Sequence, residues 1–284
     1  MRTLEKAESF ILNNARLLER RLFDYLFKDG SREAVLSALK AYQNADKGFG
    51  NALEPDKRTR SSQPVDQEVA LRILDDIGLN GSLVKDLLSF IDRITTPEGG
   101  VPFVLPTVAD APRAPWWNTD EAQPSASINP TASLAGLLHK HSADHPWLSK
   151  ATAFCWQHIE SLEDAHDNDL LCILLFLEHV PERERAQKSF ERISPIVLNR
   201  TALAPKAEGY VHYPYHYAPA PSSLAHTLYK PELIEQHLDA LTNSQQDDGG
   251  WAISWPAVSP GCELEYRGVV TLNSLKVLRA YGKV

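Results

Sequence analysis

Two stretches near opposite ends of the chain align without a gap, and this match decides the fold. Leu39–Phe49 reads LKAYQNADKGF, and Leu241–Trp251 reads LTNSQQDDGGW. Both carry leucine, glutamine, a second amide, aspartate, glycine and an aromatic residue at the same spacing. A third copy at Pro97–Phe103 matches at the acid and the glycine, and Glu208-Gly209-Tyr210 is a weaker fourth. Such self-similarity predicts a repeat architecture.

The spacing of these copies predicts one pair of helices per repeat. Gly48 and Gly100 lie 52 residues apart, and Gly209 and Gly250 lie 41 apart. The interval between Gly100 and Gly209 is about twice as long, which indicates a repeat without its motif near residues 163–165. Helical repeats of this length stack or close into an array.

The motif itself has a structural interpretation. A glutamine at a helix end can bond the last carbonyl groups, and the acid and glycine shape the turn that follows. The aromatic residue then packs on the neighbouring repeat. Such a role suffices for Gln43, Gln245, Phe49 and Trp251, although Trp251 is also a candidate for the wall of a binding cavity.

The rest of the chain predicts an all-α fold. Apolar residues recur at helical spacing, prolines and capping residues mark helix starts, and no segment alternates as a strand would. The predicted helices cover residues 3–28, 32–44, 64–78, 82–94, 130–141, 146–162, 167–179, 182–198, 231–243 and 268–281.

Composition excludes several classes of protein. The 284 residues are 43% hydrophobic with a net charge of −8, which argues against a disordered chain and against a broad basic face for nucleic acid. The longest apolar run, Leu170–Leu177, is too short to span a membrane. The N-terminus lacks the pattern of a signal peptide, and three scattered cysteines favour a reduced, cytoplasmic protein.

Prolines bear on the domain organisation. The chain has 19 prolines beside 14 glycines, and many of the prolines fall around residues 102–124, 205–221 and 256–260. Composition alone would suggest linkers between domains. Given the repeats, we interpret these segments as stiffened loops between helix pairs of a single domain spanning residues 1–284.

The stretch Gln245–Trp251 resembles the glutamine–tryptophan repeat of squalene–hopene and oxidosqualene cyclases, which also occurs in protein prenyltransferase β subunits. The resemblance covers most of the chain as a repeat pattern, with sharp motifs only in the first and last copies. It implies an α/α toroid of about five to six helical hairpins with a central cavity. It also implies an apolar or isoprenoid substrate and a cyclase-like or prenyltransferase-like reaction.

The chain departs from the catalytic signatures of these families. Neither Asp75-Asp76 nor Asp247-Asp248 lies in an Asp-x-Asp-Asp or Asp-Asp-x-x-Asp motif. Asp169 and Cys172 have the wrong spacing for the zinc ligands of prenyltransferases, and Gly261–Glu265 lacks the glutamine of a thioester motif. We therefore expect no metal and no cofactor, and any catalytic acid must be non-standard.

The loop from Asn51 to Pro64 is the first candidate site, because it follows a repeat turn and precedes a helix. Glu54 and Asp56 lie two residues apart on a loop stiffened by proline, so one of them is expected to have a raised pKa. Arg58 could bind an anion or keep a carboxylate ionised. The alternative is a solvated, charged loop.

A second candidate lies in a proline-rich loop. Trp116 and Trp117 are adjacent in an irregular segment, so at least one should contact a cavity, a ligand or a partner. Aromatic faces stabilise carbocations and also stack on sugars. Glu121 nearby is a further candidate acid. The alternative is a tryptophan that plugs the end of the barrel.

A third candidate is the segment 210–217, which is dominated by tyrosine and histidine. We predict that His212, Tyr213, Tyr215 and His216 form a polar aromatic wall of the pocket. Pro214 should prevent a regular helix and spoil a metal site between the two histidines. The alternative is that the tyrosines pack on the outer helices.

The fourth candidate lies near the C-terminus. Trp251 and Trp255 precede Glu265 and Arg267, which we place just ahead of the last helix. Glu265 could favour the helix N-terminus or act as an acid. Arg267 could bind substrate, or pair with Glu265 and close the ring against the N-terminal helix.

Together these features favour a small terpenoid-cyclase-like protein whose reaction starts with a proton from Asp56 or Glu54, or failing these Glu121 or Glu265. Trp116, Trp117 and Tyr215 would stabilise the cation. Two alternatives remain open: a carbohydrate-active α/α barrel, and a toroid that binds a ligand or protein without catalysis. The sequence leaves the oligomeric state open.

Overall fold

The computed structural model describes residues 3–284, and this part of the chain is all-α. It contains twelve α-helices and three short 3-10 helices, and its only strand-like pairings are isolated bridges. The predicted fold class is therefore confirmed. The chain divides into two compact units, residues 1–41 with 200–284 and residues 42–199. The toroid and the single domain over 1–284 stay predictions, and residues 1–2 lie outside the described part.

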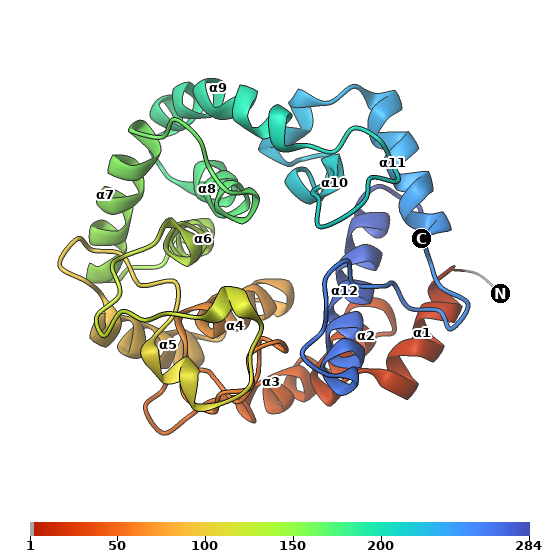
Figure 1. The fold of residues 1–284 in the computed structure, drawn as a ribbon, viewed down its shortest axis with the longest axis horizontal. Coiled ribbons are helices and arrows are strands. Elements are labelled where there is room, and N and C mark those ends of the chain that lie inside the picture. The colour runs from red at the N-terminus through yellow and green to blue at the C-terminus, as the bar shows by residue number, and fades with distance from the viewer. Residues whose placement is uncertain (1–2) are drawn as a thin grey trace. The chain divides into compact units, whose positions relative to one another are not determined.

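The first unit, which we call unit 1, combines both ends of the chain (Figure 1). Its longest helix, α12, packs against α1, α2 and α11. Phe10, Phe23 and Leu18 are among its fully buried side chains. The helices of unit 1 are α1 (Thr3–Asn14), α2 (Leu17–Phe27), α3 (Arg32–Lys40), α10 (Pro214–Tyr217), α11 (Pro231–Asn243) and α12 (Pro260–Ala280).

The second unit, unit 2, is built around a pair of helices. Figure 1 shows α6 and α8 side by side, and α6 also packs against α4 and α7. Trp147, Phe49 and Phe176 are buried in this unit. Its helices are α4 (Pro64–Ile77), α5 (Gly81–Ile94), α6 (Ile128–Lys140), α7 (Pro146–Glu160), α8 (Asp167–His179) and α9 (Arg183–Arg200).

The two largest differences from the predicted helices each have a local reason. The helix expected over 3–28 breaks after Asn14, because the Asn13 and Asn14 amides bond back to the carbonyls of Ser9 and Phe10. The last helix begins at Pro260 instead of residue 268, because the Ser259 hydroxyl accepts the Cys262 N–H and caps it.

A third correction concerns the tyrosine–histidine segment. The sequence predicted no helix there, yet Pro214 is the first residue of the short helix α10. A proline at this position loses no intrahelical hydrogen bond, because the first N–H groups of a helix have no partner inside it.

The repeat turns that end at Gly48, Gly100 and Gly250 share one backbone geometry. The N–H groups of Asn44, Thr96 and Gln246 donate to the carbonyls of Gly48, Gly100 and Gly250 at 2.8, 2.9 and 2.8 Å. In each turn the residue before the glycine has positive φ, 73° at Lys47 and 95° at Gly99 and Gly249. The third copy, which matches the other two at few residues, therefore adopts the same conformation.

The side-chain contacts of the three turns are also equivalent. Each closing glycine lies directly against a phenylalanine ring, so a larger side chain has no room there; the pairs are Gly48 with Phe90, Gly100 with Phe154 and Gly250 with Phe10. The next residue donates its N–H to a polar side chain of the following helix; these bonds join Phe49 to Gln67, Val101 to Thr131 and Trp251 to Thr271 at 3.0, 2.9 and 3.1 Å. Each turn thus joins two other helices.

The proposed fourth copy differs from these turns. Gly209 also has positive φ, 85°, but no atom lies within 4 Å of the position its Cβ would take. It lacks the packed ring that defines the other three turns.

Replacing Gly249 with alanine should destabilise unit 1 by about 2–4 kcal/mol. The substitution strains a φ of 95° and drives Cβ into the backbone carbonyl of Lys6 in α1. Gly282→Ala is the matched control, since Gly282 has φ 70° in open space and should lose only the conformational part, about 1 kcal/mol. Chemical denaturation measures the free energy of unfolding of both variants. Equal losses of stability would contradict the close packing of Gly249 against Lys6.

Candidate functional site

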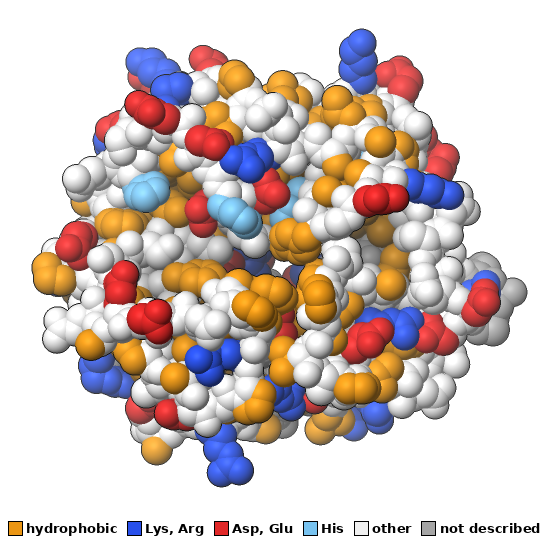
Figure 2. All heavy atoms as spheres, viewed as in Figure 1, with side chains coloured by type: hydrophobic (Ala, Val, Ile, Leu, Met, Phe, Trp, Pro, Cys, Tyr) orange, Lys and Arg blue, Asp and Glu red, His pale blue; other side chains and the backbone are white. Residues whose placement is uncertain are grey.

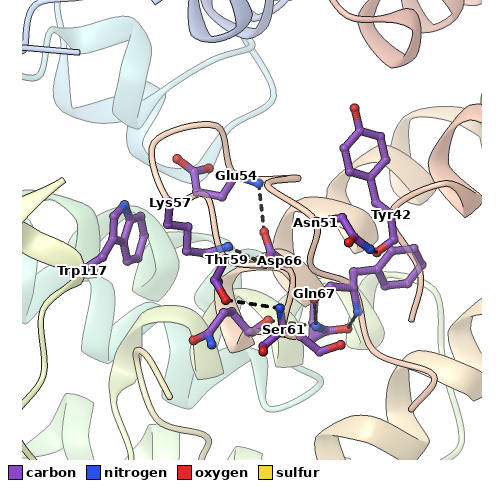
Figure 3. Close-up of polar contacts among 12 residues, drawn as sticks. Tyr42, Asn51, Glu54, Lys57, Thr59, Ser61, Asp66, Gln67 and Trp117 are labelled. Atoms are coloured by element: carbon purple, nitrogen blue, oxygen red, sulfur yellow. Dashed lines mark hydrogen bonds and ion pairs between the residues drawn. The ribbon is translucent and has the colours of Figure 1, made fainter. Parts of the chain in front are cut away.

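The loop from Asn51 to Ser61 is held in unit 2 by a buried ion pair. The ammonium of Lys57 contacts the Asp66 carboxylate in the first turn of α4, and neither side chain has any exposed surface. Asp66 also accepts the backbone N–H of Glu54 at 2.9 Å (Figure 3). One carboxylate therefore fixes the loop at two points.

Backbone and side-chain bonds complete the loop. The N–H groups of Asn51 and Ala52 donate to the carbonyls of Arg60 and Thr59 at 3.2 and 3.3 Å, so the loop folds back on itself. The Thr59 hydroxyl donates to the Thr107 carbonyl and accepts the Ser61 N–H. This network makes the loop a rigid support for the side chains at its tip.

Asp56 lies at that tip and is almost completely buried, with 2% of its surface exposed. Trp117 donates its indole N–H to Asp56 Oδ1 at 2.7 Å, and the Ala114 N–H donates to the Asp56 carbonyl at 2.8 Å. Phe103 stacks on Trp117 with the ring centroids 4.9 Å apart. Because Phe103 is only half-buried, the aromatic pair extends from the surface to the acid.

Burial raises the pKa of the Asp56 carboxyl above its ordinary value. Hydrogen bonds from Trp117 and Glu54 and the charge of Lys57 oppose this shift without cancelling it. Glu54 is also buried, and its hydrogen bond to Asp56 is one of the contacts that favour the ionised Asp56 carboxylate. Burial outweighs these contacts, so Asp56 holds its proton more strongly than a solvated aspartate does.

The other residues predicted for this region lie differently. Trp116 is 43% exposed, unlike its neighbour Trp117. Glu121 is exposed, with its N–H bonded to Thr119. Arg58 is half-buried and its guanidinium donates to the Pro55 carbonyl at 3.1 Å, within its own loop. The structure thus brings Glu54, Asp56 and Trp117 together, while Trp116 and Glu121 lie at the surface.

The tyrosine–histidine segment lies in unit 1 and forms a cluster with α11. Tyr213 contacts His216 and His237 of α11, and His212 and His216 lie 5.2 Å apart between ring centroids. His216 keeps exposed surface, yet burial within the cluster and the nearby His212 and His237 lower its pKa to about 3. Tyr215 is buried, and burial raises the pKa of its hydroxyl. Tyr215 and His216 are therefore both neutral at physiological pH.

The C-terminal candidates have packing contacts within unit 1. Trp251 is buried and donates its indole N–H to the Leu241 carbonyl at 2.8 Å. Trp255 meets Tyr266 edge-on. Glu265 and Arg267, expected ahead of the last helix, lie inside α12.

Arg267 has a different ionic partner from the one predicted. Its guanidinium binds Asp248 at 2.7 Å and lies over the Phe10 ring of α1. Arg267 therefore joins α12 to the repeat turn and to α1 within unit 1.

Sequence reasoning missed the residues that hold the loop. The sequence pattern assigns no role to Lys57 and places Asp66 only within a helix. The available signal was an acid in the first turn of a helix that starts with Pro64. Gln67 was also missed; its amide bonds both the N–H and the carbonyl of Phe49, at 3.0 and 2.9 Å.

Within residues 3–284, no group of three or more His, Cys, Asp or Glu side chains is arranged to hold a metal ion. None of the described helices is long and apolar enough to cross a membrane. Over the face shown in Figure 2, acidic and basic side chains are interspersed without an extended patch of one sign.

Replacing Trp117 with phenylalanine should raise the pKa of Asp56 further. The indole N–H stabilises the ionised carboxylate, whereas a phenyl ring keeps the stacking on Phe103 and donates nothing. Carbon-13 NMR titration of the aspartate carboxyls measures this shift. Trp116→Phe is the matched control and should leave the titration unchanged, because Trp116 is exposed. A downward shift in Trp117→Phe would contradict the assigned contact.

No known family model matches this chain, and no curated protein sequence matches it either.

Proposed function

We propose that this protein is a terpenoid-cyclase-like enzyme that starts the cyclisation of an isoprenoid by proton transfer from Asp56. The observation that carries the proposal is the buried Glu54–Asp56 pair, whose burial raises the pKa of Asp56. A carboxyl group that stays protonated nearer to neutral pH is a stronger candidate for a general acid.

The surrounding groups suit each stage of such a step. The π electrons of a substrate alkene take the Asp56 proton, which leaves a carbocation on the substrate and a carboxylate on Asp56. The indole N–H of Trp117 stabilises that carboxylate as it forms, and the contact with Glu54 also favours the ionised form of Asp56. The faces of Trp117 and Phe103 offer cation–π stabilisation. A base or water then removes a proton from the cyclised cation, and solvent reprotonates Asp56.

The carboxyl separation argues against a glycosidase. Retaining glycosidases keep their two carboxyl groups about 5 Å apart and inverting ones keep them further apart, to leave room for the sugar or a water. Glu54 and Asp56 are in direct hydrogen-bond contact. A binding module without catalysis remains the second candidate, supported by the extensive bonds that hold this loop.

The proposal also includes a substrate class and a cellular location. We place the substrate among apolar or isoprenoid small molecules, with no nucleic acid involved. We also place the protein in the cytoplasm, supported by three cysteines that are all buried free thiols.

The test is incubation of the protein in D₂O with farnesyl and geranylgeranyl diphosphates and the corresponding alcohols. Because the Asp56 proton exchanges with solvent, a proton-initiated reaction places one deuterium in each cyclised product. Mass spectrometry detects this deuterium and its position. A reaction that starts by loss of diphosphate would give cyclised product without deuterium, and no conversion of any substrate would favour the binding module. Either result would contradict the proposal.

A further inference from the structure

Unit 2 contains a surface pocket that is separate from the Asp56 loop. Its volume is about 470 Å³, and it is lined by residues of α6, of α7 and of the start of α9. Sites of this size hold small molecules. The lining groups that can bind a ligand are His139, Asp144, Trp156, Glu182 and Arg185. None of them takes part in the proton-transfer site.

Trp156 and Glu182 form the rigid part of the pocket. Trp156 is 3% exposed, and its indole N–H donates to Glu182 Oε1 at 3.1 Å. This bond fixes the carboxylate, which leaves its second oxygen as an acceptor. Glu182 itself lies at the surface. The site therefore presents a surface carboxylate on a buried support.

His139 adds a second acceptor. Its Nε2 lies 2.8 Å from the Thr152 hydroxyl, and that hydroxyl donates its single hydrogen to the Leu148 carbonyl at 2.7 Å. Nε2 must therefore be the donor in the contact with Thr152. Burial lowers the pKa of His139, so the ring is neutral at physiological pH and its Nδ1 carries a lone pair.

Arg185 supplies the opposite charge. Its guanidinium lies over the Trp156 ring at 4.3 Å, and its Nε donates to Glu160 at 2.7 Å. The ring and Glu160 orient the guanidinium of Arg185, which lines the pocket. A planar guanidinium held in this way is suited to bind a carboxylate through two hydrogen bonds.

We propose that this pocket binds a small zwitterion, a free α-amino acid, with its ammonium on Glu182 and His139 and its carboxylate on Arg185. A simple anion would be repelled by Glu182 and Asp144, and a simple amine would leave Arg185 without a ligand. The zwitterion satisfies both charges, and Ala143, Leu148 and Ala153 provide an apolar wall for its side chain.

The test uses the indole ¹⁵N–¹H NMR signal of Trp156, assigned by its loss in Trp156→Phe. Each of the twenty standard L-amino acids is titrated into the full-length protein to about 20 mM, a range that covers millimolar affinity. We expect a saturable shift of this signal. The deaminated and decarboxylated analogues of the tightest binder should each bind at least about tenfold more weakly, as expected for loss of a charge-assisted bond.

Two variants locate the ligand. Glu182→Gln keeps an acceptor for Trp156 and removes the charge, and Arg185→Gln removes the guanidinium; each should weaken binding by about tenfold or more. Glu184→Gln, an exposed acid two residues from Glu182 that does not line the pocket, is the matched control and should bind as the wild type does. The proposal is overturned if no amino acid gives a saturable shift, if either analogue binds as well as the amino acid, or if both variants retain full affinity.

Discussion

Replacing Lys57 or Asp66 with alanine is expected to lower the free energy of unfolding by about 3–5 kcal/mol, the usual cost of breaking a buried ion pair. Both side chains are fully buried, so each single substitution leaves the opposite charge without its counter-ion inside the protein. Asp66→Ala also removes the acceptor of the Glu54 N–H. Urea denaturation followed by tryptophan fluorescence measures the loss.

Two further variants show whether loss of the buried ion pair itself causes this decrease in the free energy of unfolding. Lys140→Ala breaks the partly exposed pair with Asp75 and should cost at most about 1 kcal/mol. The double variant Lys57→Met with Asp66→Leu leaves no isolated charge and should be less destabilised than the sum of the single variants. Single losses no larger than that of Lys140→Ala would mean that the pair does not hold the loop.

Replacing Asp56 with asparagine is expected to reduce isoprenoid turnover by about 10²–10⁴-fold, the usual contribution of a general acid. Asparagine is nearly isosteric and still accepts the Trp117 N–H, so the loop should keep its structure. The measurement is the rate of product formation under saturating substrate. Glu121→Gln is the matched control, because Glu121 is exposed, and it should retain full turnover. Unchanged turnover in Asp56→Asn would remove Asp56 as the acid.

The same variant should be more stable than the wild type at neutral pH. The folded-state pKa of Asp56 is raised, so the folded protein binds this proton more tightly than the unfolded chain does. The resulting stabilisation of the wild type is complete below the pKa of the unfolded chain, about 3.9, and is lost as the pH rises through the raised value. The advantage of Asp56→Asn should therefore appear above that range and shrink in acid. A constant difference at all pH values would contradict the raised pKa.

The repeat turns could be predicted from sequence because their determinants are local. Each turn requires a glycine against a phenylalanine ring and, just before it, a residue with positive φ. These requirements place the same residue types at a fixed spacing in the sequence, as around Gly48 and Gly250. The third turn at Gly100 has the same geometry with fewer matching residues. The helices started by Pro64, Pro146 and Pro231 were predicted for the same reason.

The contacts that build the site could be predicted only in part. The spacing of Glu54 and Asp56 predicted an acid with a raised pKa, and the structure gives that direction for Asp56. The indole that reaches Asp56 comes from Trp117, and no local pattern distinguishes it from its exposed neighbour Trp116. Lys57 can be buried because the Asp66 carboxylate neutralises its charge. The two side chains meet only in the folded chain.

The most direct test of the central claim is the carbon-13 NMR titration of the Asp56 carboxyl in the wild-type protein, assigned by its loss in Asp56→Asn. The account predicts a titration midpoint clearly above the value of about 3.9 for a solvated aspartate. A midpoint at or below that value would show that Asp56 is an ordinary ionised carboxylate, and the proposed proton donor would be wrong.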